Sequence, residues 1–313
     1  MGTVQASGAQ YVLTHGESEA VVASVGASLR SYTHARRPLV VGFDADQVRP
    51  NYRGTTLAPW PNRVVDGRYA FEGAAHQLAL TEPARGHALH GLLSWAEFRL
   101  VALGRSHVVL EAVVEPQDGY PWRVRVLTTY ALDDDGLTQS VRAENLSDAP
   151  APFGTGPHPY LVAGEGTVDD WTLELPASRV LAVTPDRLSP TELVPVDEAF
   201  DFRTARTLGA TEIDHAFTGL DADGDGITTV RVTDASGAGV AMSWDGRCPW
   251  VQIHTADTPG SPGTHRVGLA VEPMTCAPDA FNASRYPFDT GLIVLPSGGT
   301  AEASWCIRTI PAP

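Results

Sequence analysis

Four short stretches of this sequence carry more polar chemistry than a folded core needs. The first, residues 59–63, places an amide and a guanidinium, Asn62 and Arg63, next to the indole of Trp60. Amide and guanidinium groups donate hydrogen bonds to neighbouring hydroxyls, and an indole can stack on the apolar face of a polyhydroxylated ring. The same stretch also suits a proline-rich turn with a surface arginine.

Two histidines lie in surroundings that restrict or free the backbone. His90 is followed directly by a glycine, which allows close approach of the backbone and the imidazole to a ligand. His158 lies between two prolines, with Tyr160 close behind, and such a fixed backbone is suited to aiming one imidazole. The alternative interpretations are an ordinary loop histidine and a rigid turn.

The fourth stretch ends in a carboxylate, Glu272, after the apolar run 267–271. Burial there would raise the pKa of this carboxyl toward the range of a general base. A glutamate at a strand end that reaches solvent is the alternative. Each stretch alone is a weak indication of a functional site, but the four taken together are a strong one.

The elements that must position these residues are predicted to be β-strands. Short apolar runs with period-two character alternate with turn signals such as Glu72-Gly73, Asp135-Gly136 and Ser236-Gly237. No segment keeps a 3.6-residue period over a dozen residues, so helices should be few and short. Prolines are spread along the chain and no repeat is found, which favours one domain over residues 1–313. The expected strands include residues 19–25, 68–71, 107–114, 123–131, 137–144, 228–233, 240–244, 251–255, 267–272 and 301–307.

Taken in order, these motifs resemble those of the aldose 1-epimerase (galactose mutarotase) family. That family shows an Asn-Arg pair before a Gly-Arg-aromatic hairpin, then Leu-His-Gly, then His-x-Tyr, and finally a glutamate in an apolar strand. The resemblance covers nearly the whole chain, and Pro-Trp-Pro-Asn-Arg and His-Pro-Tyr look most like a bacterial subgroup. The matching residues here are Asn62-Arg63, Leu89-His90-Gly91, His158-Pro159-Tyr160 and Glu272, with Asp214 and Gln252 before the last.

The resemblance implies a large two-layer antiparallel β-sandwich, the galactose mutarotase-like supersandwich, with a sugar cleft on one face. It implies interconversion of the α and β anomers of a free aldohexose by ring opening and closure, with no metal or cofactor. His158 would be the general acid and Glu272 the general base. The sugar hydroxyls would be bound by Asn62, Arg63, His90, Tyr160, Asp214 and Gln252.

Departures from the family pattern leave the substrate open. Pro157 precedes the histidine where many members have Asn, and Leu161 follows the tyrosine where many have Phe. An anionic hexose, such as sulfoquinovose or a hexose 6-phosphate, is an alternative substrate that Arg63 or Arg85 would have to hold. A non-catalytic sugar-binding module and a glycoside-cleaving enzyme with two carboxylates, Asp214 and Glu272, are further alternatives. Three tryptophans are candidate stacking platforms: Trp60, Trp95 and Trp122.

The amino-acid composition excludes several classes of binding partner and of catalytic chemistry. The formal net charge is −15 without a basic stripe, so nucleic acid is not expected. No leader or membrane-spanning stretch is visible, and the three cysteines are scattered, so we expect a cytoplasmic protein, monomer or homodimer, that binds a monosaccharide and no membrane. All 22 basic residues are arginines, so Schiff-base catalysis and Walker-type phosphate loops are excluded. The acidic stretch 221–227 resembles the start of a calcium loop but is expected to be a plain hairpin turn.

Overall fold

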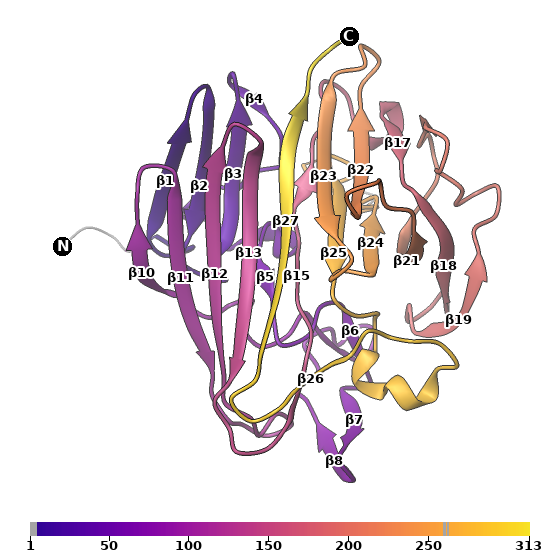
Figure 1. Cartoon of the computed structure of the whole chain (residues 1–313). Helices are drawn as coiled ribbons and strands as arrows, with labels where there is room; N and C mark the ends of the chain where they lie inside the picture. Colours follow the sequence, from indigo (N-terminus) through magenta and orange to yellow (C-terminus); the bar gives the residue numbers. More distant parts are fainter. Residues whose placement is uncertain (1–4, 259–260, 262) are drawn as a thin grey trace.

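The computed structural model describes residues 5–258, 261 and 263–313, and its regular structure is almost entirely antiparallel β. A nine-stranded sheet crosses the whole molecule (Figure 1). In spatial order its strands are β10 (Arg99–Leu103), β11 (His107–Val114), β12 (Val124–Asp133), β13 (Gly136–Asn145), β27 (Thr300–Ile310), β23 (Gly239–Asp245), β22 (Ile227–Thr233), β17 (Thr172–Glu174) and β20 (Arg206–Thr207).

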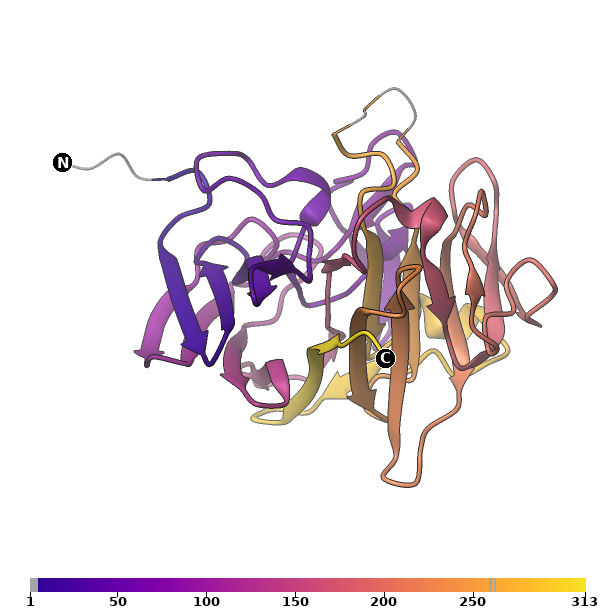
Figure 2. The same cartoon turned by 90° about the horizontal axis from the view of Figure 1, so that it is seen from above.

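A second layer is formed by two smaller sheets, one toward each end of the nine-stranded sheet (Figures 1 and 2). The four-stranded sheet contains β1 (Gln10–His15), β2 (Ser18–Ala23), β3 (Ser28–His34) and β4 (Arg37–Pro38). The six-stranded sheet has the order β16 (Tyr160–Leu161), β25 (Leu269–Met274), β24 (Trp250–His254), β21 (Asp214–Leu220), β18 (Ala177–Val183) and β19 (Pro190–Pro195).

Short elements complete the fold. Four two-stranded pairs are β5 (Thr56–Leu57) with β15 (Gly156–Pro157), β6 (Arg63–Val65) with β9 (His87–Leu89), β7 (Arg68–Phe71) with β8 (Ala74–Gln77), and β14 (Ala151–Phe153) with β26 (Ile293–Leu295). The described helical segments are the 3-10 turns η1 (Pro50–Tyr52), η2 (Val168–Asp170) and η3 (Ala280–Arg285). The predicted all-β sandwich with few short helices is therefore confirmed.

The two layers bury one continuous apolar core, and burial follows the strand pattern. Along β12, inward residues such as Val126 and Tyr130 are buried, and their neighbours are partly exposed, because its sheet has one solvated face. In β25 all six residues are buried. Its odd-numbered residues, Leu269 and Val271, join the core, and its even-numbered ones face the opposite side of the sheet.

Several predicted details are wrong. The acidic stretch 221–227 joins β21 to β22, which belong to different sheets, so it is a connection between layers and not a hairpin. The Asp223 carboxylate accepts hydrogen bonds from the backbone N–H groups of Asp225 and Ile227, at 3.0 and 2.9 Å, as a turn residue does. The strand that carries Glu272 continues to Met274, so the glutamate lies inside the strand and is 1% exposed.

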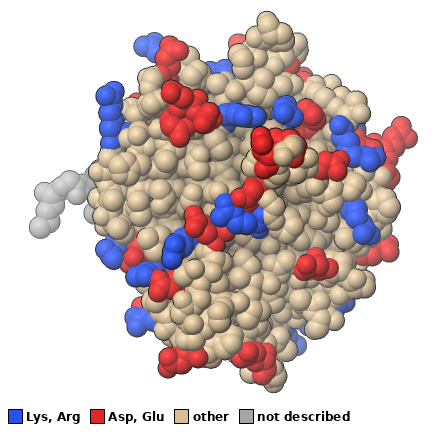
Figure 3. Space-filling model, viewed as in Figure 1, with Lys and Arg blue, Asp and Glu red and all other residues tan. Residues whose placement is uncertain are grey.

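The surface charges, the cysteines and the helical segments complete the description of the fold. On the face shown in Figure 3, arginines are interspersed with acidic residues, and neutral surface separates the clusters. Cys248, Cys276 and Cys306 are free. In the described part of the chain, no helix is long and apolar enough to cross a membrane.

Candidate functional site

A polar cavity of about 300 Å³ lies against the six-stranded sheet. All eight residues that the sequence predicted for the site line it: Asn62, Arg63, His90, His158, Tyr160, Asp214, Gln252 and Glu272. They come from five strands and three loops, so only the folded chain brings them together. The cavity is also lined by residues that the sequence analysis did not select, namely Asn51, Tyr52, Glu82, Leu89, His254, Asp257 and Thr258, and by Arg85, named there only for an anionic sugar.

Strand register places one row of polar groups on the floor of the cavity. Glu272 of β25 lies directly opposite Gln252 of β24, and Asp214 of β21 lies opposite His254. Side chains two residues apart in a strand share a face, so Gln252 and His254 point the same way. Tyr160 of β16 is paired with Ala270, two residues before Glu272, and therefore joins the same face.

The central feature of the floor is a buried imidazole–carboxylate pair. His158 Nε2 lies 3.4 Å from Glu272 Oε1, and the two side chains are 6% and 2% exposed. His158 Nδ1 and Glu272 Oε2 have no hydrogen-bond partner among the described residues. Gly156 permits this approach, because a Cβ there would lie 2.7 Å from the carbonyl oxygen of Pro273, next to Glu272.

Burial favours the uncharged form of both partners. The pKa of Glu272 is raised well above its ordinary value, mainly by desolvation and then by the negative charge of Asp214. Desolvation, followed by the neighbouring His254, lowers the pKa of His158 to about 3. The pair thus holds one transferable proton over a wide pH range.

One wall is built from two residues in the left-handed backbone region, Asn62 with φ 53° and His90 with φ 61°. The His90 amide donates to the Asn62 carbonyl at 2.9 Å, and the Asn62 side chain accepts from the Arg63 amide at 2.9 Å. Gly91 follows with φ 74°, and a Cβ there would lie 2.1 Å from the Ala58 carbonyl oxygen. The Leu-His-Gly motif is therefore needed for a close backbone crossing.

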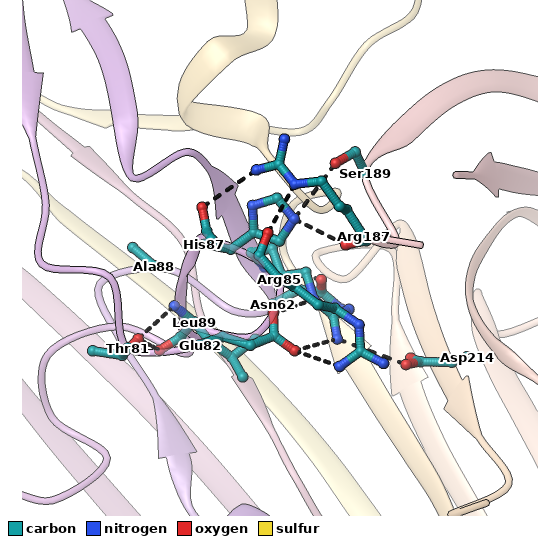
Figure 4. A network of polar contacts seen from close by, with 12 residues as sticks. Asn62, Thr81, Glu82, Arg85, His87, Ala88, Leu89, Arg187, Ser189 and Asp214 are labelled. Carbon is teal, nitrogen blue, oxygen red and sulfur yellow. Dashed lines mark hydrogen bonds and ion pairs between the residues drawn. The ribbon is translucent and has the colours of Figure 1, made fainter. Parts of the chain in front are cut away.

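Arg63 is held in an ion-pair network at the side of the cavity. Figure 4 shows its partners Glu82 and Asp214, together with Arg85. Its Nε and Nη2 donate to the two oxygens of Glu82, at 2.8 and 3.1 Å. Arg85 Nη1 donates to the same carboxylate at 2.9 Å. Arg63 Nη2 also lies 3.7 Å from Asp214 Oδ2, and Gln252 Nε2 donates to Asp214 Oδ1 at 2.6 Å.

The state of Asp214 follows from this network. Desolvation alone would raise its pKa, but the charges of His254 and Arg63 and the Gln252 hydrogen bond outweigh burial and lower it. Asp214 therefore stays ionised where Glu272 does not. The pKa values of Asp214 and Glu272 are shifted in opposite directions because His254, Arg63 and Gln252 offset burial at Asp214, whereas burial and the negative charge of Asp214 act together on Glu272.

Aromatic rings connect the acid–base pair with the surface. The His158 ring lies 5.0 Å from that of His90 and 5.2 Å from that of Tyr160. His90 in turn lies 4.7 Å from Tyr52, which contacts Trp95 at 5.5 Å. Trp95 is 52% exposed, whereas the other two predicted stacking platforms, Trp60 and Trp122, are buried in the core.

Of two cavity residues that were not predicted, His254 could have been found from the sequence and Glu82 could not. His254 lies two residues after Gln252 in the same strand, so period-two spacing could have placed it in the cavity. Glu82 lies in a loop without strand pattern, and its contact with Arg63 becomes visible only in three dimensions. Among the described residues, no group of three or more His, Cys, Asp or Glu side chains is arranged to hold a metal ion.

Comparison with known proteins connects this geometry to one family. The aldose 1-epimerase family model matches residues 9–303. YihR of Escherichia coli K12, an uncharacterised protein, is 33% identical over 294 residues, which are 93% of this chain and 90% of YihR. Human galactose mutarotase is 26% identical over 177 residues, 54% of this chain and 51% of that protein.

Solved structures support the fold. The GalM/aldose epimerase homologue from Caenorhabditis elegans superposes with a TM-score of 0.81 at 20% identity, covering 97% of this chain and 99% of that one. At this identity the likeness concerns the arrangement of strands and not the substrate.

Proposed function

This chain belongs to the aldose 1-epimerase family, and from that premise we propose that it interconverts the α and β anomers of a free, uncharged aldohexose. The observation that carries the proposal is the buried pair of His158 and Glu272, 3.4 Å apart at the floor of a polar cavity. Anomerisation needs one group that accepts a proton and one that donates a proton on the same small ring. This pair supplies both from side chains of the chain itself.

We assign the steps as follows. Glu272 takes the proton of the C1 hydroxyl while His158 protonates the ring oxygen, the bond between C1 and the ring oxygen breaks, and a C1 aldehyde forms. After rotation about the C1–C2 bond, the former ring oxygen adds to the other face of the aldehyde. His158 takes the proton from that oxygen and Glu272 gives its proton to the C1 oxygen, so the two residues have exchanged roles. A bound sugar donates a hydrogen bond to the carboxylate and accepts one from the imidazolium, so it favours the charged pair that ring opening requires.

Unpaired polar atoms around the cavity support a polyhydroxylated substrate. His90 Nδ1, Gln252 Oε1 and His254 Nδ1 are buried and have no partner among the described residues, as is true of the free atoms of His158 and Glu272. Buried polar groups in folded proteins are nearly always hydrogen-bonded, so these atoms indicate a ligand with several hydroxyl groups. Asp214, Gln252 and Arg63 lie where they could bind such hydroxyls.

The charges of the cavity favour a neutral sugar over an anionic one. Two arginines, Arg63 and Arg85, face four carboxyls, and both arginines are already paired with Glu82. The carboxyls are those of Glu82, Asp214, Asp257 and Glu272. For an anionic hexose the more accessible cationic group would be Arg85, whose side chain is 40% exposed, whereas that of Arg63 is 9% exposed.

The first prediction tests the acid–base pair. His158→Asn and Glu272→Gln should each reduce enzymatic anomerisation by about 10²–10⁴-fold, the usual contribution of one general acid or base. Polarimetry or NMR of freshly dissolved α-glucose and α-galactose measures the rate above spontaneous mutarotation. Glu272→Gln keeps the side-chain size, and His158→Asn keeps a polar side chain that is smaller than the imidazole, so we expect sugar binding to survive in both variants.

Two outcomes would contradict this assignment. Full activity in either variant would remove that residue from the chemistry. A wild-type protein that binds aldoses but accelerates no anomerisation would instead indicate the sugar-binding module that the sequence leaves open.

A further inference from the structure

The carboxylate of Glu82 holds Arg63 by two hydrogen bonds, and the donors that these bonds use show which edge of the guanidinium is left free. A guanidinium has five N–H groups. Glu82 engages the Nε–H and one Nη2–H of Arg63, and Asp214 lies 3.7 Å from the same Nη2. No hydrogen bond from Arg63 Nη1 to another described residue is present, so the Nη1 edge is the one left for a ligand.

Glu82 is itself rigidly held by a tight turn. Its amide donates to the His87 carbonyl at 3.0 Å, and its carbonyl accepts from the amide of Gly86 at 2.8 Å. His87 begins β9, which is paired with β6 so that Leu89 lies opposite Arg63. The turn therefore connects the carboxylate and the guanidinium through a continuous backbone frame.

A neighbouring loop braces this turn from outside (Figure 4). Arg187 Nε donates to the Arg85 carbonyl at 2.9 Å, and the His87 ring nitrogen Nε2 lies 2.9 Å from the Arg187 carbonyl. These hydrogen bonds, which are partly buried, support the turn that carries Glu82 from a second segment of the chain. The Glu82 side chain is 12% exposed and that of Arg63 is 9% exposed, so water screens their interaction little.

We infer that Glu82 is a positioning residue. It fixes Arg63 with its Nη1 edge toward the sugar and keeps the guanidinium from forming an ion pair with the catalytic carboxyl of Glu272. The inference rests on the proposed mutarotase function. Without Glu82, the nearest carboxylates for the buried guanidinium are Asp214 and then Glu272, whose pKa already responds to Arg63. An unbalanced or displaced Arg63 would favour ionised Glu272 and would lower its pKa.

Titratable and charged groups from several elements line the same cavity as Glu272. Arg63 belongs to β6 and is paired with Glu82, which also binds Arg85. The other groups belong to the six-stranded sheet and to the loops around it. They are His158, Tyr160, Asp214, His254 and His90.

Glu82→Gln tests the inference, because it keeps the size of the side chain and removes its charge. We expect the KM for the aldose to rise about tenfold while kcat changes less, since Arg63 binds the ground state and the transition state alike. We also expect the alkaline limb of the pH–rate profile to move about one pH unit lower, following the pKa of Glu272. Glu82→Asp keeps the charge but shortens the reach, so it should restore the limb more fully than the KM.

Glu111 provides a matched control. It pairs with Arg99 at 2.6 Å, its side chain is 13% exposed, and it lies on β11, outside the cavity. Glu111→Gln should leave both the KM and the pH limb unchanged. Loss of stability alone would change the melting temperature in either variant without shifting the limb.

Wild-type KM and an unmoved limb in Glu82→Gln would overturn the inference, and so would an equal shift in Glu111→Gln. If wild-type protein accelerates no anomerisation, the proposed function fails, and the inference is then decided without turnover. A ¹³C-NMR titration of the Glu272 carboxyl should show a lower pKa in Glu82→Gln than in wild type. An unchanged titration would overturn the positioning role. If Glu82→Gln does not fold, Glu82→Asp decides the case by its KM or, without turnover, by its affinity for the aldose: weaker binding with a Glu272 titration near that of wild type supports the inference, and wild-type binding would overturn it.

Discussion

At the scale of residues, the distinctive feature is that burial shifts the two catalytic candidates in opposite directions. The pKa of His158 falls to about 3 and that of Glu272 rises well above its ordinary value, in both cases mainly by desolvation. Apparent pKa values of such a closely spaced pair belong to the pair and not to one residue. The quantity that matters is the number of protons on the pair, which must be one for it to donate and accept.

This count gives a prediction for the pH dependence of kcat/KM. As the pH rises through the raised pKa of Glu272, the pair loses its only proton and the rate should fall. As the pH falls, a second proton binds only near pH 3, so the acidic limb should lie far below the ordinary histidine value. Polarimetry from pH 4 to 9, corrected for spontaneous anomerisation, measures the alkaline limb and shows whether any acidic limb lies above pH 4. An acidic limb near pH 6.5, the ordinary histidine value, would show that His158 is not desolvated in solution.

At the scale of elements, the site depends on close backbone contacts as much as on strands. Gly91 has a positive φ and lies where a Cβ would meet the Ala58 carbonyl oxygen at 2.1 Å. Gly91→Ala must therefore displace the segment that carries His90. We expect a loss of stability of about 1–3 kcal/mol from the strained backbone and a higher KM, measured by thermal unfolding and by anomerisation kinetics.

Gly246 provides the comparison for this prediction. No atom lies within 4 Å of a Cβ built there, so Gly246→Ala should change neither the melting temperature nor the KM appreciably. Equal effects of the two substitutions would mean that the crossing at Gly91 does not constrain the cavity wall.

The same scale shows what the sequence could predict. Period-two runs located strands with one solvated face, and β7 and β11 begin and end at the predicted residues. β21 was missed because two adjacent residues, Ala216 and Phe217, are both buried, which breaks the alternation. The order of strands depends on pairs such as β13 with β27, which are far apart in the chain and leave no local pattern.

The site shows the same division. Motifs predicted six of the eight residues that the structure places around one cavity, and each of these motifs includes a glycine or proline that shapes the local backbone. Asp214 and Gln252 were predicted only from the family resemblance. Glu82 and Tyr52 belong to none of these sequence motifs. Their importance arises from contacts with Arg63 and His90, which form only when separate segments meet.

At the scale of the whole molecule, a net charge of −15 and a cavity with more carboxyls than arginines should repel anions. We expect the KM of glucose 6-phosphate and sulfoquinovose to exceed that of glucose and to fall as salt screens the repulsion, whereas the KM of glucose should not respond. Anomerisation kinetics at 0.02 and about 0.5 M salt test this. An anionic sugar that is preferred at low salt would instead assign Arg85 to its recognition.

The absence of lysine from this sequence has a chemical consequence for the proposed reaction. Each turnover would unmask an aldehyde inside the cavity, and the nitrogen groups that line it are guanidinium, imidazole and amide. Arginine stays protonated at any pH the protein experiences, and so it is a poor partner for imine formation. No lysine side chain anywhere in the chain can be glycated by the sugar that the cavity opens. A protein that handles reducing sugars in their most reactive form thus lacks the side chain through which such sugars most readily form covalent adducts.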